Sequence, residues 1–113
     1  IAQAQNADVF VHEVAAARSE IQAANPAIGL VMAHHASPAE VGRVFAQTQP
    51  KLALLTHMVL LKPDPVSVEE VMAEVATEYD GTVMVAEDLM RFELGRNISV
   101  IPYHHGGWPH GKV

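Results

Sequence analysis

Cysteine is absent from the 113-residue sequence, and this absence excludes several kinds of site together. Without cysteine the chain has no internal disulfide, no thiolate ligand for zinc and no cysteine nucleophile. The redox compartment stays open, because there are neither disulfides nor free thiols to indicate it. Any metal bound by this chain must therefore be held by histidine and carboxylate side chains.

Basic side chains are also scarce. Seven Lys and Arg residues stand against 13 Asp and Glu residues, which gives a net charge of −6, and the basic positions do not cluster. A surface that follows a phosphate backbone needs several positive side chains on one face. We therefore do not expect this segment to bind nucleic acid by itself.

Long apolar runs are missing as well. Apolar residues make up 50% of the sequence, but Pro, Gly and charged positions interrupt them well short of the roughly 18 residues that cross a bilayer. The chain also lacks the basic and apolar segments of a secretion signal. The sequence therefore predicts one soluble folded domain without a membrane helix, and it leaves the compartment undetermined.

The apolar segments that are present include several strand-like runs. Val9-Phe10-Val11 is rich in β-branched and aromatic residues and ends at His12-Glu13. Leu52-Ala53-Leu54-Leu55 is too short for a buried helix and leads into Thr56-His57. Two further runs, Thr82 to Ala86 and Met90 to Leu94, complete the strands that we expect.

Two helices have clear start signals. Ser37 and Glu40 form one capping box, and Ser67 and Glu70 form another, each followed by an amphipathic pattern. The stretch Ala15 to Asn25 is weakly helical, and the state of Ala27 to Ala33 stays open. Strands and helices alternate, so we expect an α/β fold with a largely parallel sheet over 1–102, followed by an extended tail over 103–113.

Three residues with useful chemistry fall near the same edge of this predicted sheet. Glu13 and His57 stand where predicted strands end, and His35 precedes the helix between them. Ligands of open α/β sheets collect at the carboxyl ends of the strands. A neutral imidazole can bind a divalent metal there, and a carboxylate beside a second imidazole can fix its tautomer and move protons.

Each of these residues also has a purely structural interpretation. His57 can be a hydrogen-bonded group at a strand end, His35 a capping or packing group, and Glu13 a solvated strand end. For His12, which points away from Glu13 in a regular strand, a core position is favoured. Histidines in the tail are expected to be exposed.

Three motifs taken in order resemble a known family. The strand with His12-Glu13, the turn His35-Ala36-Ser37 that opens a helix, and Leu54-Leu55-Thr56-His57 are similar to the C-terminal half of metallo-β-lactamase-fold hydrolases. The resemblance covers about Ala7 to Val85 and is strongest to the branch of RNase Z and arylsulfatase-like metallohydrolases. It implies the C-terminal β/α half of an αββα sandwich, in a longer chain.

The resemblance also implies roles for the three residues. His57 matches the last metal-binding histidine of the family, while His35 and Glu13 match a catalytic pair that assists proton transfer beside the metals. The implied cofactor is Zn²⁺, with two ions in the intact protein. The implied reaction is hydrolysis of a small ester, sulfate, phosphodiester or lactam-like molecule by metal-bound hydroxide.

The sequence departs from the family pattern in two places. The His-x-His-x-Asp-His motif that supplies most metal ligands is absent, so we expect the upstream half of the same domain to supply them and this segment alone to be inactive. Met58-Val59-Leu60 follows His57 where RNase Z proteins tend to have Arg-Tyr after a small residue. This difference counts against transfer RNA as the substrate.

Two alternatives from other classes remain at this stage. The incomplete ligand set and the aromatic tail from Tyr103 to Trp108 are compatible with a non-catalytic α/β module that forms homo-oligomers through its tail. A flavodoxin-like or receiver-like domain has less support, because no glycine-rich phosphate loop follows the first strand.

Overall fold

A parallel sheet forms the centre of the fold. The structure, a computed structural model, describes residues 2–103. Within this range β1 (Val9–Ala16), β2 (Leu52–Leu60) and β3 (Val83–Val85) lie in the order β1-β2-β3, and both neighbouring pairs are parallel. The predicted alternation of strands and helices around a parallel sheet is confirmed.

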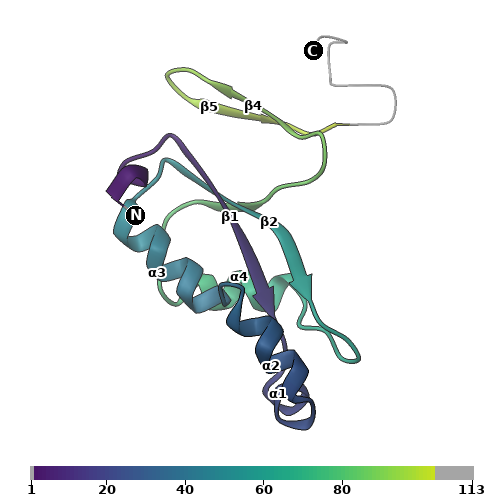
Figure 1. Cartoon of the computed structure of the whole chain (residues 1–113). Coiled ribbons are helices and arrows are strands. Elements are labelled where there is room, and N and C mark those ends of the chain that lie inside the picture. The colour runs from purple at the N-terminus through teal and green to yellow at the C-terminus, as the bar shows by residue number, and fades with distance from the viewer. Residues whose placement is uncertain (1, 104–113) are drawn as a thin grey trace.

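Helices α3 (Pro38–Thr48) and α4 (Val68–Ala76) pack side by side against one face of this sheet (Figure 1). Both predicted capping boxes are present, with Ser37 and Ser67 accepting from the backbone N–H groups of Glu40 and Glu70. The buried core joins both helices to β1 and β2 and includes Val14, Val41, Phe45, Leu55, Val71 and Val75. A Cβ on Gly42 would lie 2.7 Å from the Val75 carbonyl oxygen, so this glycine permits the close contact of α3 with α4.

A short helical hairpin connects β1 to α3. It consists of α1 (Ser19–Ala24) and α2 (Pro26–Ala33), and neither helix has a fully buried residue. Asn25 caps α2 by accepting from the Ala27 N–H group, and Pro26 occupies the first turn, which explains why this ambiguous stretch is helical. Within the described part of the chain, no helix reaches the length and apolar character of a bilayer-spanning segment.

A second, antiparallel pair of strands lies at the opposite end of the molecule from α1 and α2 (Figure 1). It consists of β4 (Arg91–Leu94), which the sequence predicts, and β5 (Ile98–Ile101), which it does not. A 3-10 turn, η1 (Ala2–Ala4), precedes β1. Of the predicted tail, all but Tyr103 lies outside the described residues, so the domain boundary at 102 stays a prediction.

The ends of β1 and β2 differ from the sequence prediction. We expected β1 to end at His12-Glu13 and β2 to end at His57, but β1 continues to Ala16 and β2 to Leu60. The weakly helical stretch also begins later, because α1 starts only at Ser19. The reason is burial: residues 14–16 are 0 to 6% exposed and pair with residues 58–60 beyond the polar positions.

Candidate metal centre

A β-bulge in β2 places His57. Glu13 pairs with Thr56 and the next residue, Val14, pairs with Met58, so His57 is an extra residue between two paired ones. Its φ of 47° lies in the left-handed region, which is uncommon for residues other than glycine. A bulge re-aims a side chain out of the regular alternation of a strand. The exposed His57 ring therefore reaches Glu13 and His35, although β2 continues past it.

The backbone of Ala36 is held against the edge of β1 by two hydrogen bonds. Its N–H group donates to Glu13 Oε1 at 2.8 Å, and its carbonyl oxygen accepts from the Ala15 N–H group at 2.9 Å. The bond to Glu13 is charge-assisted, and such hydrogen bonds are stronger than those between neutral groups. Together the two bonds fix the segment between α2 and α3, and so they fix the position of His35.

The second carboxylate oxygen of Glu13 binds the His35 ring. Glu13 Oε2 lies 3.1 Å from His35 Nδ1, with the two side chains 32% and 26% exposed. Since a carboxylate only accepts, the hydrogen is on Nδ1. Nε2 is then the ring nitrogen that can accept a proton. Burial alone raises the pKa of Glu13, but the Ala36 N–H bond, the His35 bond and the charges of His35 and His12 outweigh it and lower that pKa.

Glu13, His35 and His57 form a compact group. One ligand atom from each lies within 4.8 Å of the others, and the rings of His35 and His57 stack with centroids 6.2 Å apart at 28°. Two ligands on one zinc ion are at most about 4.2 Å apart, twice the usual Zn–N distance. Both Glu13 oxygens already accept hydrogen bonds, so the arrangement is compatible with a metal on His57 beside the Glu13-His35 pair.

The structure places together the three residues that were selected from the sequence. The reason for selecting them was partly wrong, because β1 and β2 do not end at Glu13 and His57 but continue past them. His12, for which a core position was favoured, is only half-buried, and its ring packs on the side of Phe10 and Phe45. His34 is the exposed C-cap residue of α2. The tail histidines lie outside the described residues. The backbone of Ala36 was missed, because a contact made by main-chain atoms leaves no sequence signal.

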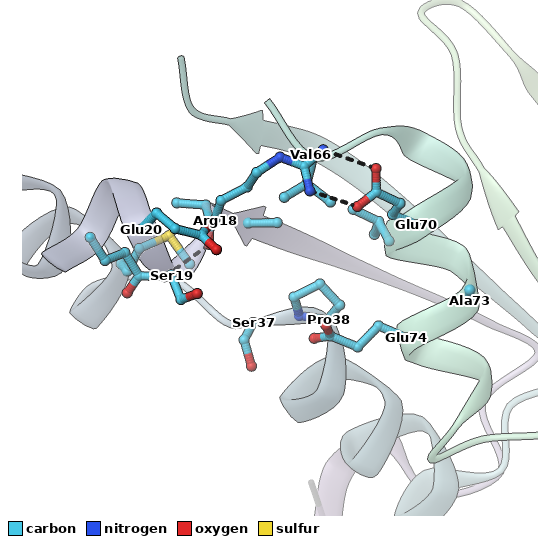
Figure 2. A pocket seen from close by; sticks show the side chains of 14 residues that line it. Arg18, Ser19, Glu20, Ser37, Pro38, Val66, Glu70, Ala73 and Glu74 are labelled. Carbon is cyan, nitrogen blue, oxygen red and sulfur yellow. Dashed lines mark hydrogen bonds and ion pairs between the residues drawn. The ribbon is translucent and has the colours of Figure 1, made fainter. Parts of the chain in front are cut away.

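A cavity of about 620 Å³ is lined by residues from the end of β1, the start of α3, and α4 (Figure 2). Glu13, His35 and His57 are not among them. Arg18 crosses it and binds both carboxylate oxygens of Glu70, at 3.0 and 3.1 Å, while its Nε lies 2.9 Å from a carboxylate oxygen of Asp64. These contacts tie the end of β1 to the loop before α4. We assign Arg18 a role in holding the fold, which the sequence did not reveal.

No family model matches the sequence. Among solved structures, the metallo-β-lactamase-fold protein YhfI from Bacillus subtilis aligns with 77% of this chain and 31% of its own, at 22% identity and a TM-score of 0.54. This chain has part of the metallo-β-lactamase fold. The predicted fold class, a β/α half of that sandwich, is confirmed by this likeness.

Curated relatives of this metallo-β-lactamase-fold chain carry the name Ribonuclease Z. Those of Pseudomonas putida strains KT2440 and W619 are each 31% identical, over 100 and 98 residues. The aligned regions cover 85% and 83% of this chain. The chain spans only about 30% of the length of these relatives. The predicted resemblance to the RNase Z branch is therefore confirmed, at low identity.

Proposed function

We propose that this chain forms part of a metal-dependent hydrolase, in which His57 is a metal ligand and Glu13 and His35 handle protons. The observation that supports it most directly is the bulge, which brings the exposed His57 ring within 4.8 Å of an already bonded carboxylate-imidazole pair. A strained backbone at a polar site is typical of functional residues. A histidine with only a packing role would not need it.

The residues divide the chemistry between them. When bound, zinc supplies activation of a water molecule and stabilisation of negative charge. His57 would hold the ion through a ring nitrogen. Glu13 keeps the hydrogen of His35 on Nδ1, which leaves Nε2 as the atom that takes or gives a proton at the substrate. The other ligands, including those of a second zinc ion, would come from the upstream half of the same domain.

We propose a small phosphodiester as the substrate class, with small esters, sulfates and lactam-like molecules as the alternatives. The relatives named Ribonuclease Z support a phosphodiester. The net charge of −6 and the sequence Met58-Val59-Leu60 after His57 do not favour a transfer RNA. A small substrate would need no extended basic surface on this segment.

Metal analysis and hydrolysis assays on the intact protein test this proposal. Bis(p-nitrophenyl) phosphate serves as the probe substrate. We expect His57→Ala and His57→Gly to lose bound metal and to lower kcat/KM at least about 100-fold, since even outer-shell residues cost 10- to 100-fold. The glycine variant removes the ring and adopts the left-handed φ without steric strain, so it separates loss of the ring from strain at the bulge.

His34→Ala is the matched control. His34 is an exposed histidine next to His35 in the sequence, and it does not belong to the group of Glu13, His35 and His57. The variant should keep its metal and its activity. Unchanged metal content and hydrolysis in both His57 variants would overturn the proposal.

A further inference from the structure

The carbonyl group of Glu13 lies on the outer edge of β1, which pairs with no other strand within residues 2–103. The backbone groups of successive residues in a strand point to opposite sides, so residues two apart point to the same side. The Ala16 carbonyl oxygen accepts from Leu61, just past β2, whereas the Ala15 N–H group points the other way, to Ala36. Glu13 is two residues from Ala15 and so shares its direction. Edge strands leave such groups without a strand partner, and the Glu13 carbonyl oxygen needs another donor.

The His12 ring supplies that donor. Its Nδ1 atom lies 2.7 Å from the Glu13 carbonyl oxygen. A carbonyl oxygen can only accept, so the contact requires the hydrogen of His12 to be on Nδ1. A side chain on one face of β1 thus binds the backbone of its neighbour, whose own side chain belongs to the site.

Aromatic contacts hold the His12 ring in place. Its centroid is 5.8 Å from that of Phe10 and 6.3 Å from that of Phe45, to which it is almost perpendicular at 89°. Phe45 is fully buried in the core. Edge-to-face contacts of this kind favour one ring orientation. The donor is therefore directed by the core and is not free to turn into solvent.

The bonded carbonyl belongs to the peptide at which the two strands change register. Glu13 pairs with Thr56 and Val14 with Met58, so the peptide between Glu13 and Val14 lies opposite His57. From the same residue the carboxylate reaches Ala36 and His35. A tilt of this peptide would move the carboxylate relative to both of its partners.

We infer that His12 is a positioning residue, whose Nδ1–H group fixes the Glu13-Val14 peptide and thereby holds the Glu13 carboxylate on Ala36 and His35. The catalytic consequence rests on the proposed function, but the positioning itself does not. Residues that orient the groups at a metal site typically change activity 10- to 100-fold when they are replaced.

Two variants of the intact protein separate the hydrogen bond from the ring packing. His12→Phe keeps an aromatic ring beside Phe10 and Phe45 but has no donor. His12→Asn has a short amide whose N–H group can take the place of Nδ1–H, but it has no ring. Amide hydrogen exchange at Ala36 and the ¹⁵N shift of His35 Nδ1 report the positioning without substrate, and kcat and KM for bis(p-nitrophenyl) phosphate report its effect.

We expect His12→Phe to accelerate exchange at Ala36 by about tenfold, the size of one lost hydrogen bond. We also expect it to shift the His35 Nδ1 resonance and to lower kcat about tenfold with little change in KM. His12→Asn should restore the exchange rate at Ala36 and kcat to within about threefold of the wild type, and it should return the His35 Nδ1 resonance toward its wild-type position. Wild-type exchange and His35 shift in a folded His12→Phe variant would overturn the inference, and so would an equal defect in His12→Asn. If the wild type does not hydrolyse the probe, only the proposed function fails, because exchange still tests the positioning.

Discussion

Glu13 connects the backbone of the site to its chemistry, because its two carboxylate oxygens have different partners. One accepts from the Ala36 N–H group and the other from His35 Nδ1. Protonation would weaken both bonds, since a neutral carboxyl group is a poorer acceptor than a charged carboxylate. The charged form is therefore the form that holds the site together.

This arrangement predicts a dependence of stability on pH. The pKa of Glu13 is lower in the folded protein than its usual value of 4.5. The stability that the charged carboxylate adds is therefore complete above pH 4.5 and is lost as the pH falls through the lower, folded pKa. Glu13→Gln should reduce the free energy of unfolding by about 1 to 2 kcal/mol at neutral pH.

Denaturant unfolding of the wild type and of Glu13→Gln between pH 7 and pH 2.5 measures this effect. The difference between the two proteins should shrink as the pH falls below 4.5. Glu69→Gln is the control, since Glu69 is an exposed carboxylate in the first turn of α4. A Glu13→Gln difference that stays constant across this range would contradict the prediction.

At the residue scale, the sequence revealed the members of the site but not their geometry. Glu13, His35 and His57 could be proposed from the order of their motifs and from the edge rule for parallel sheets. The bulge could not be predicted, because one extra residue in β2 changes the pairing without changing the apolar pattern of Leu52 to Leu55. The left-handed φ of His57 has no sequence signal either.

At the scale of elements, the start of α3 is close to the site and the start of α4 is not. Ser37 caps α3 two residues after His35, whereas Ser67 caps α4 after the loop that Arg18 holds. Both caps have the same chemistry, a hydroxyl oxygen that accepts from the third backbone N–H group. The two helices therefore provide a matched pair of substitutions.

Ser37→Ala and Ser67→Ala should each lower the free energy of unfolding by about 1 kcal/mol, the usual cost of a lost N-cap. Only Ser37→Ala should also impair hydrolysis of bis(p-nitrophenyl) phosphate, because fraying of α3 loosens the segment that contains His35 and Ala36. Thermal unfolding and kcat for both variants check this. Equal losses of kcat in the two variants would show that the start of α3 has no special link to the site.

The starts of α3 and α4 were easier to predict from the sequence than the ends of the strands, for a physical reason. A capping box marks the start of a helix with two specific residues, as Ser37 and Glu40 do. Strands have no such marker, and the polar residues His12 and Glu13 looked like an end because burial resumes only at Val14. β5 was missed although Ile98, Val100 and Ile101 surround a single serine, Ser99.

At the scale of the whole molecule, the alternating order of elements was enough to predict the sheet. The same order could not place β4 and β5, which pair with each other and not with the parallel sheet. Local patterns do not specify which strands become neighbours, since pairing depends on contacts between distant parts of the chain. The likeness to YhfI extends over 77% of the chain, so the order of elements reflects a common architecture.

Metal binding should be visible as a change in the stability of the whole protein. A ligand that binds only the folded state adds about 2.7 kcal/mol at a free concentration 100 times its Kd. We expect Zn²⁺ to raise the thermal unfolding midpoint of the chelator-treated intact protein. In His57→Gly the increase should be smaller, because the variant lacks the ring at this corner of the site.

Differential scanning fluorimetry with and without Zn²⁺ measures both shifts. Mg²⁺ at the same concentration serves as a control, since it prefers oxygen ligands to imidazole. The same shift with Zn²⁺ in the wild type and in His57→Gly would argue against a metal on His57.

The two hydrogen bonds of Ala36 have a consequence for how such sites change in evolution. Both bonds use the main chain, so a serine, threonine or glycine at position 36 can make them as well as alanine does. Substitution at this position would leave both hydrogen bonds intact, and the sequence would not show that they are kept. Distant homologues could therefore keep the same attachment of the His35 segment to β1, and only a comparison of coordinates would reveal that they share it.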